Sequence, residues 1–376
     1  MTDNSNKDDK NKEAKNMEAK THQRDKAQKE NDWKSENSPD RALGIDIGTS
    51  KIVLAEKKNG SIDFTSERNA FILVDYSKFT EKILEQNQID YLKKDKSLIV
   101  FGDGAEIFAS MLNTETRRPM RQGLLNPQEP FSIEIIKEIL NSLVLKSENS
   151  NIRLSFSIPD APKDFGADII YHETILRRHL ETKGYKTKVI NEGLAVIFSE
   201  LEEENFTGIG ISFGGGMCNV CLAYLSVPLI SFSITKGGDY IDDAVSSVTG
   251  KVNTRVRSIK ENGFNLTAKP NGDVEDALRI YYDDLIMTMV KTLKESIIQT
   301  SDVLKVDRPV PIVLSGGTAK AAGFKDRFEH FLKAEEMPLD FSQIRMAHDP
   351  LNATAKGALI AAINESCRSL VTMCCK

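Results

Sequence analysis

The sequence lacks several features that define specialised classes of protein. No stretch approaches the roughly 20 apolar residues that a membrane span needs, and the N-terminus has no apolar core typical of a secretion signal. Only five cysteines occur in 376 residues, which does not indicate a disulfide scaffold. The formal net charge of −5 gives no reason to expect nucleic acid as a partner. Together, these absences predict a cytoplasmic protein.

Apolar residues are present in the amount that a large folded protein needs, but they are unevenly distributed. They make up 40% of the 376 residues, and single cores stop growing at about 250–300 residues, so two packed domains are expected. Residues 1–40 consist mainly of Lys, Asp, Glu, Asn and Ser, with Trp33 as the only aromatic. Such a segment buries too little apolar surface to offset its ordering entropy. We expect a disordered arm there, either a solvated spacer or a tether to an anchoring protein.

Two glycine-rich hairpins organise the remaining chain. Apolar stretches at 42–47 and 51–55 flank a short turn that begins at Gly48, and a similar pair at 208–213 and 217–225 flanks three consecutive glycines. This duplication predicts two related α/β halves whose turns meet at a common cleft, a preferred location for ligands.

Apolar spacing and turn residues predict the other elements. We expect helices over residues 104–112, 131–145, 167–183, 194–203, 274–304, 323–333 and from 352 past 363. We expect strands over residues 61–65, 98–101, 152–158, 188–190, 229–235 and 310–314.

The turns have the chemistry of a phosphate site. Consecutive backbone N–H groups in a glycine-rich turn form a concave anion site, and glycine lets a phosphate approach closely. Asp46 precedes the first turn, where its carboxylate suits the water shell of Mg²⁺. Competing phosphate motifs fail, because no Gly-x-x-x-x-Gly-Lys-Ser/Thr loop occurs and a Gly-x-Gly-x-x-Gly pattern starting at Gly208 breaks at Phe213.

The ordered set of motifs resembles the superfamily of actin, sugar kinases and DnaK-type chaperones, and within it the prokaryotic actins of the MreB and magnetosome kind. The resemblance covers residues 41–365. It implies an α/β, two-domain actin-like fold, with duplicated ribonuclease-H-like domains around a cleft that holds ATP or ADP with Mg²⁺. The motifs begin at Gly44, Asn191, Phe213, Gly237, Val313 and Asp349.

The resemblance also implies roles for individual residues. Glu192 would position the attacking water and Asp46 would hold Mg²⁺ through water, which gives both a catalytic role. The implied nucleotide-binding set comprises Gly48, Thr49, Ser50, Lys51, Gly214, Gly215, Gly216, Met217, Gly238, Asp239, Arg257, Lys260, Gly316, Gly317 and Thr318.

The second phosphate motif departs from the family pattern. The family has Asp-x-Gly-Gly-Gly-Thr, whereas this chain has Ser212 in place of the aspartate and Met217 in place of the threonine. The glycine backbone still suits phosphate, but transition-state charge in phosphoryl transfer is handled mainly by metal and positioning. We therefore expect ATPase activity that is slow or absent, while nucleotide binding survives.

The expected domains follow from these motifs. Residues 1–40 form the arm, 41–205 domain I, 206–347 domain II and 348–376 a C-terminal helix that returns to domain I. Within domain I, residues 71–130 form a small inserted subdomain, whose segment from Arg118 to Gly123 resembles that of MreB-type actins. Within domain II, residues 251–307 form an upper subdomain.

The resemblance implies a cytoskeletal protein that binds ATP and assembles with itself into filaments. One alternative is an ATP-binding scaffold or pseudo-ATPase of the same fold that does not polymerise, which Ser212 and Met217 favour. A small-molecule kinase is a further alternative, with Asp239 as the candidate base. No nucleic acid partner is expected, and an anchoring protein would bind the N-terminal arm.

Several other residues have an ordinary structural interpretation beside a functional one. Cys218 and Cys221 are predicted to be core thiols rather than metal ligands, because no second pair accompanies them. His172 and His179 are predicted to be solvated helix positions. Arg117, Arg118 and Arg121 are expected to form a surface basic cluster or a subunit contact. The cysteines at 367, 374 and 375 are expected to lie in a frayed tail, or else to be lipidated or cross-linked.

Overall fold

The computed structural model describes residues 41–374 except 113, 148–150, 164–168, 301–305 and 307, and only the backbone of residues 365–374. The predicted N-terminal arm and the predictions for the tail cysteines fall outside the described residues and side chains. Within the described residues, no helix combines the length and the apolar character that crossing a membrane requires.

The first sheet has five strands in the order β10-β9-β1-β2-β3. The strands β1, β2 and β3 form an antiparallel meander, and β9 and β10 run parallel to β1. Asn59 and Gly60 close the β2–β3 hairpin with φ of 50° and 87°, values that suit the Asn-Gly turn of a two-residue hairpin. The strands are β1 (Ala42–Ile47), β2 (Lys51–Lys58), β3 (Ser61–Arg68), β9 (Arg153–Ile158) and β10 (Lys186–Asn191).

The second sheet repeats the same plan, with the order β13-β12-β11-β14-β15. A three-stranded antiparallel meander is again followed by two strands parallel to its first strand. The duplication predicted from the two hairpins is therefore confirmed at the level of sheet topology. The strands are β11 (Gly208–Phe213), β12 (Cys218–Tyr224), β13 (Val227–Ile234), β14 (Val310–Ser315) and β15 (Phe341–Met346).

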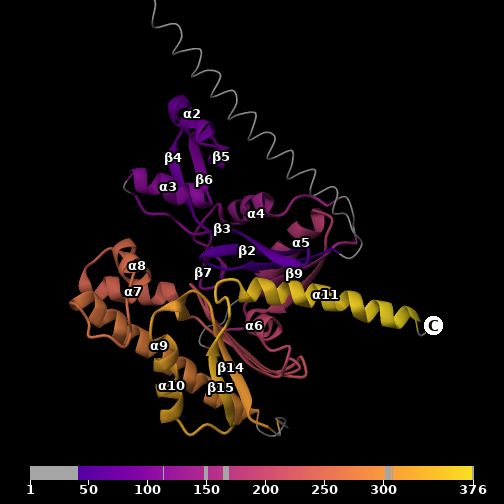
Figure 1. The fold of residues 1–376 in the computed structure, drawn as a ribbon. Coiled ribbons are helices and arrows are strands. Elements are labelled where there is room, and N and C mark those ends of the chain that lie inside the picture. Colours follow the sequence, from indigo (N-terminus) through magenta and orange to yellow (C-terminus); the bar gives the residue numbers. More distant parts are fainter. Residues whose placement is uncertain are drawn as a thin grey trace, which may run out of the picture. The chain divides into compact units, whose positions relative to one another are not determined.

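Two helices connect the sheets. The helix α11 (Ala353–Cys374) packs on β1 and β9, α6 (Glu192–Glu200) packs on β11 and β12, and the two helices pack against each other (Figure 1). Glycines allow this close packing, since a Cβ at Gly357 would overlap the carbonyl of Ala195 and one at Gly44 would overlap the backbone of Leu359. The paired helices α6 and α11 thereby link β1 to β11, the first strands of the two hairpins.

Further helices complete the two halves. On the first sheet, α4 packs against β2 and β3, and α5 packs against β10. In the second half, α7, α8 and α10 pack against α9, which contacts β13 and contributes to a large apolar core. These helices are α4 (Ser132–Leu143), α5 (Ile169–Thr182), α7 (Gly238–Thr249), α8 (Asn253–Glu261), α9 (Asp273–Gln299), α10 (Phe324–Ala334) and the 3₁₀ turn η1 (Thr318–Lys320).

A small unit with its own core lies between β3 and α4 in the sequence. It contains a three-stranded sheet of order β4-β6-β5, and its core is built around residues such as Leu84, Val100 and Phe108. A two-stranded ribbon, β7 with β8, follows it. These elements are β4 (Phe71–Asp75), α2 (Lys78–Gln86), β5 (Tyr91–Lys94), β6 (Ser97–Phe101), α3 (Asp103–Leu112), β7 (Met120–Arg121) and β8 (Leu124–Leu125).

The predicted helices and strands are all present, with shifted ends, but the solvated positions predicted on α5 are not. His179 is partly buried, with its Nε2 3.1 Å from Asn141 Oδ1. His172 is 1% exposed, and its Nδ1 accepts a hydrogen bond of 3.3 Å from the backbone N–H of Leu125. The expectation of a solvated residue fails because β8 covers this face of the helix. Cys218 and Cys221 are buried free thiols in separate apolar clusters, which confirms their prediction as core residues.

Candidate functional site

The first turn, defined here as residues 48–50, connects β1 to β2. Its backbone closes through a 3.0 Å hydrogen bond from the Gly48 N–H to the Lys51 carbonyl. Buried Asn69 supports it from the end of β3, where its amide donates to the Gly48 carbonyl at 2.9 Å and its N–H donates to the Ser50 carbonyl at 3.1 Å. The first turn therefore has a fixed backbone, with Thr49 buried and the Lys51 side chain exposed.

The second turn, defined here as residues 214–217, connects β11 to β12 in the equivalent position. Gly214 N–H donates to the Met217 carbonyl at 2.9 Å. The beginning of α7 packs on this turn, because Gly238 N–H donates to the Gly214 carbonyl at 3.0 Å and Asp239 N–H donates to the Gly215 carbonyl at 2.8 Å. A Cβ at Gly237 would lie 2.5 Å from the Gly215 carbonyl oxygen, so only glycine permits this approach.

The two turns lie directly against each other. A Cβ at Gly215 would overlap the Ser50 hydroxyl, and a Cβ at Gly216 would overlap the Thr49 hydroxyl. Thr49 Oγ also accepts a 3.1 Å hydrogen bond from the Gly123 N–H. Two glycine-rich backbones and two hydroxyls thus converge, as expected from the sequence, and they are drawn together by the fold from residues more than 160 apart in sequence.

A pair of carboxylates comes from the end of β1 and the start of α6. Asp46 accepts a 2.8 Å hydrogen bond from the Ser157 hydroxyl, and removal from solvent raises its pKa to about 6 despite that bond. Removal from solvent and the charge of Asp46 raise the pKa of Glu192 to about 8. Glu192 is held by Asn219 at 2.9 Å and by Ser212 at 3.2 Å. The two residues predicted to be catalytic are therefore electrostatic neighbours.

Asp160, which the sequence analysis missed, is a third carboxylate in this group. It follows the carboxyl end of β9, its side chain accepts from Asn191, and its N–H donates to Asn219 at 3.2 Å. Burial raises the pKa of Asp160 to about 6, and its charge contributes to the raised pKa of Glu192. Its place after a central parallel strand was a usable signal, since ligands bind outside the carboxyl ends of such strands.

The third turn, defined here as residues 316–318, follows β14 and lies beside the second. Gly316 has a φ of 95°, and a Cβ there would overlap the Phe213 carbonyl. Thr318 Oγ donates to the Gly214 carbonyl at 2.8 Å. By contrast, a Cβ at Gly317 would meet only the end of Leu351, at 3.7 Å, so the backbone there remains approachable by a flat ligand.

Comparison with known proteins places the chain in a family. The family model described as Volactin matches residues 42–362. The chain belongs to the Volactin family. No curated protein matches it.

Solved structures show that this Volactin-family chain has the actin-like fold. The structure "MamK double helical filament" is 18% identical, with a TM-score of 0.64 over 86% of this chain and 98% of that one. MreB 5 of Spiroplasma citri bound to AMPPNP is 14% identical, with a TM-score of 0.62 over 88% of this chain and 98% of that one. The predicted fold class and the predicted resemblance to MreB-type and magnetosome-type actins are confirmed.

Two cations predicted to bind nucleotide, Arg257 and Lys260, both pair with a buried carboxylate in this Volactin-family structure. Asp242, on α7, lies 2.7 Å from Lys260 Nζ and 3.3 Å from Arg257 Nε. Lys260 also donates to the Gly238 carbonyl at 2.8 Å. Arg257 Nη2 lies 3.9 Å from Asp239 Oδ1. These residues therefore fix α8 to the start of α7, close to the second turn.

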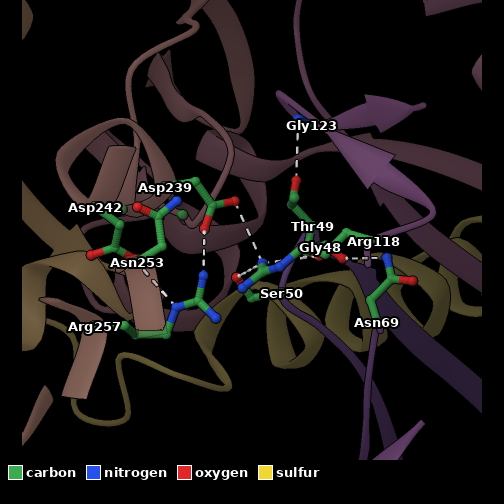
Figure 2. A network of polar contacts seen from close by, with 12 residues as sticks. Gly48, Thr49, Ser50, Asn69, Arg118, Gly123, Asp239, Asp242, Asn253 and Arg257 are labelled. Carbon is green, nitrogen blue, oxygen red and sulfur yellow. Dashed lines mark hydrogen bonds and ion pairs between the residues drawn. The ribbon is translucent and has the colours of Figure 1, made fainter. Parts of the chain in front are cut away.

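Arg118, which was predicted to belong to a surface basic cluster or a subunit contact, lies beside the first turn. Instead of belonging to a surface cluster, it contacts Ser50 and Asp239 (Figure 2). Its neighbour Arg117 pairs with Glu129 at 3.1 Å. Gly216, Arg118, Asp239 and Arg257 belong to the lining of a cavity of about 530 Å³ that also contacts the 115–126 segment.

The described residues contain no group of three or more His, Cys, Asp and Glu side chains arranged to ligate a metal directly. That result concerns direct ligands only, whereas the carboxylate of Asp46 is predicted to contact Mg²⁺ through water. Such contacts suit Mg²⁺, which usually keeps several waters in protein sites.

Proposed function

We propose that this protein binds ATP or ADP between the first, second and third turns and assembles with itself into filaments. The observation that carries the proposal is the direct opposition of two glycine-rich turns from topologically equivalent sheets. Anion binding by such turns needs backbone N–H groups that a ligand can approach, and glycine carries no side chain that would block this approach.

The residues present fit a nucleotide. Backbone of the first and second turns would hold the phosphates, aided by the hydroxyls of Thr49 and Ser50, and the third turn would lie against the nucleoside. Asp46 would hold the water shell of Mg²⁺, and a bound Mg²⁺ would neutralise charge on the phosphate oxygens. Gly238 and Asp239 support the second turn from α7. The structures of MamK and Spiroplasma citri MreB 5 include complexes with AMPPNP and ADP, which supports the nucleotide class.

Hydrolysis would be slow. Ser212 occupies the position of the family carboxylate and donates to Glu192, so one charge that would help hold the metal's waters is missing. Burial and the charge of Asp46 raise the pKa of Glu192, which disfavours the charged form that would accept a proton from water. Met217 is 3% exposed and packs against Gly123, so it supplies packing instead of a hydroxyl.

Filament formation is supported by the fold and by the name of one structural relative. MamK forms a double helical filament, and contacts that do not close into a ring generate filaments. A cytoplasmic, cytoskeletal location and an anchoring protein bound by the N-terminal arm belong to the same proposal. The test is sedimentation and electron microscopy of the full chain with ATP and Mg²⁺. Nucleotide-dependent filaments are expected, and a monomer that binds ATP without pelleting would contradict assembly.

The alternative function is a non-polymerising ATP-binding scaffold or pseudo-ATPase. The substitutions at Ser212 and Met217 favour it, because both remove polar chemistry from the second turn while its glycines remain. Kinase activity is less well supported, since the candidate base Asp239 forms ion pairs with Arg118 and Arg257. The same sedimentation experiment separates the first two functions, because both predict ATP binding and only one predicts filaments.

A further inference from the structure

The guanidinium of Arg118 contacts both the first turn and Asp239, the residue whose N–H supports the second turn. Its Nη1 lies 2.7 Å from the Ser50 hydroxyl and 3.4 Å from the Thr49 carbonyl, both in the first turn. The same nitrogen lies 3.4 Å from Asp239 Oδ2, at the start of α7, whose N–H holds the second turn. Figure 2 shows the side chain between the Ser50 and Asp239 side chains.

The backbone on either side keeps Arg118 in this position. Arg117 exchanges two 2.8 Å backbone hydrogen bonds with Phe71 at the start of β4. Pro119 follows, and its carbonyl accepts from the Asn126 N–H at 2.9 Å. The Asn126 amide donates to the Arg118 carbonyl at 3.5 Å. These contacts set the backbone position of Arg118, so ligand binding costs only the ordering of its side chain.

The guanidinium also has capacity for a ligand. Among the described residues, all three polar contacts of the Arg118 side chain use Nη1, which leaves Nε and Nη2 as donors. The side chain is 21% exposed and lines the 530 Å³ cavity. Three arginines and three carboxylates line that cavity, so its formal charges balance and the net charge alone does not favour an anion.

The order of contacts along the second turn indicates which phosphate would reach Arg118. The Gly214 end faces the third turn through Thr318, where the nucleoside is proposed to lie. Gly215, the next residue, lies against the Ser50 hydroxyl and near the Asp239 carboxylate, the two side-chain groups that Arg118 contacts. A phosphate chain that starts at the third turn and follows the second turn would therefore pass Gly214 before it comes near Arg118.

We propose that Arg118 is a phosphate-binding residue that distinguishes a nucleoside triphosphate from a diphosphate, an inference that rests on the proposed nucleotide site. The planar guanidinium pairs with two phosphate oxygens at once. A terminal phosphate draws Arg118 away from Ser50 and Asp239, whereas a diphosphate leaves those contacts intact. Arg118 thus couples the terminal phosphate to the contact between the two halves of the molecule.

The test compares the affinities of AMPPNP and ADP, with Mg²⁺, for the full chain carrying Arg118→Ala. Losing a charged hydrogen-bond partner is expected to weaken AMPPNP binding roughly ten- to hundred-fold, with ADP affinity changed by less than about threefold. Arg121→Ala is the matched control, since Arg121 lines the same cavity but bonds only Gln128, at 3.3 Å, among the described residues. It should change neither affinity.

The outcomes separate this inference from the proposed function. If the wild-type chain binds neither nucleotide, the proposed nucleotide site is wrong and the phosphate-binding role of Arg118 falls with it. If the wild type binds both and Arg118→Ala weakens both equally, or neither, only the role of Arg118 is overturned. Should Arg118→Ala fail to fold by circular dichroism, Arg118→Lys keeps the charge and loses the fork, and selective weakening of AMPPNP is again the expected result.

Discussion

The hydroxyl of Ser50 lies directly against Gly215, with no room for a Cβ at position 215. This contact joins the turn after β1 to the turn after β11, so it reports how closely the two halves approach. It also means that the glycine is needed for packing, in addition to the phosphate access that we propose for it.

Gly215→Ala is expected to destabilise the protein by about 1–3 kcal/mol, the usual cost of overpacking. Ser50→Ala removes the oxygen that the new methyl group would strike. The free energy of unfolding lost in the double variant should therefore be smaller than the sum of the losses in the two single variants. Urea denaturation of all four proteins in a double-mutant cycle measures this difference. Strictly additive effects would show that the two residues do not meet in solution.

Glu200→Gln should weaken the connection between α6 and the segment that leads to α11. Buried Glu200 accepts from Arg345 Nη1 at 2.7 Å, from His348 Nδ1 at 2.7 Å and from the His348 N–H at 3.1 Å. Because Arg345 and His348 are partly solvated, we expect a loss of about 1–3 kcal/mol in the free energy of unfolding.

Exposed Glu202, two residues further on, provides the control, and Glu202→Gln should change stability by less than about 0.5 kcal/mol. Burial alone would raise the pKa of Glu200, but the hydrogen bonds from Arg345 and His348 outweigh it and hold the pKa below its ordinary value. Its contribution should therefore be present at neutral pH and fade as the pH falls through that lowered pKa. Equal effects of both substitutions would contradict a special role for Glu200.

Buried His172 should make stability depend on pH. Burial lowers its pKa from 6.5 to about 4, so between these values the unfolded chain binds a proton that the folded chain does not. Stability from this residue is complete above pH 6.5 and falls by up to about 1.4 kcal/mol per pH unit as the pH drops towards 4. His172→Gln should flatten the slope in urea-denaturation midpoints across that window, and an unchanged slope would contradict the buried neutral state.

The sequence predicted the fold well because the signals were local and repeated. Each glycine turn sits between two apolar strands, so the hairpins and their duplication could be read directly. Strand β15 was missed because Phe341–Met346 mixes polar with apolar residues at a sheet edge. Helix α8 was missed because it buries only Val256, which leaves almost no apolar periodicity to detect.

The site was predicted less completely because several of its contacts join distant parts of the chain. Asp46 and Glu192 could be proposed from short local motifs, but Asn69, Arg118 and Asp160 come from segments whose relation to the turns depends on the folded topology. His172 was misplaced for the same reason, since its partner Leu125 lies 47 residues away. Spacing within one element cannot reveal such neighbours.

Ser212→Asp should restore a carboxylate to the second phosphate motif. Ser212 Oγ lies 3.2 Å from Glu192, so the new charge would face Glu192 and Asp46 and lower stability unless a cation is bound. With ATP and Mg²⁺, we expect phosphate release to rise roughly tenfold or more, equivalent to about 1.4 kcal/mol of transition-state stabilisation. Ser212→Ala removes the hydroxyl without adding charge and should produce no rise.

A stability gain that depends on Mg²⁺ in Ser212→Asp, and not in Ser212→Ala, would support a cation close to Asp46. Rapid phosphate release by the wild-type protein would contradict slow hydrolysis. If Ser212→Asp folds, binds nucleotide and releases no more phosphate than the wild type, then the lost carboxylate is not what limits turnover.

The most direct test of the account is equilibrium titration of the full chain with ATP and Mg²⁺, in parallel with Gly216→Val and Glu202→Gln. Valine at position 216 would occupy the space beside Thr49, whereas Glu202 is remote from the turns and exposed. A nucleotide site between the turns predicts saturable one-site binding by the wild type and by Glu202→Gln. It also predicts that Gly216→Val loses this binding while retaining the wild-type circular dichroism spectrum. Absence of binding by the wild type, or undiminished binding by folded Gly216→Val, would contradict a nucleotide site between the two turns.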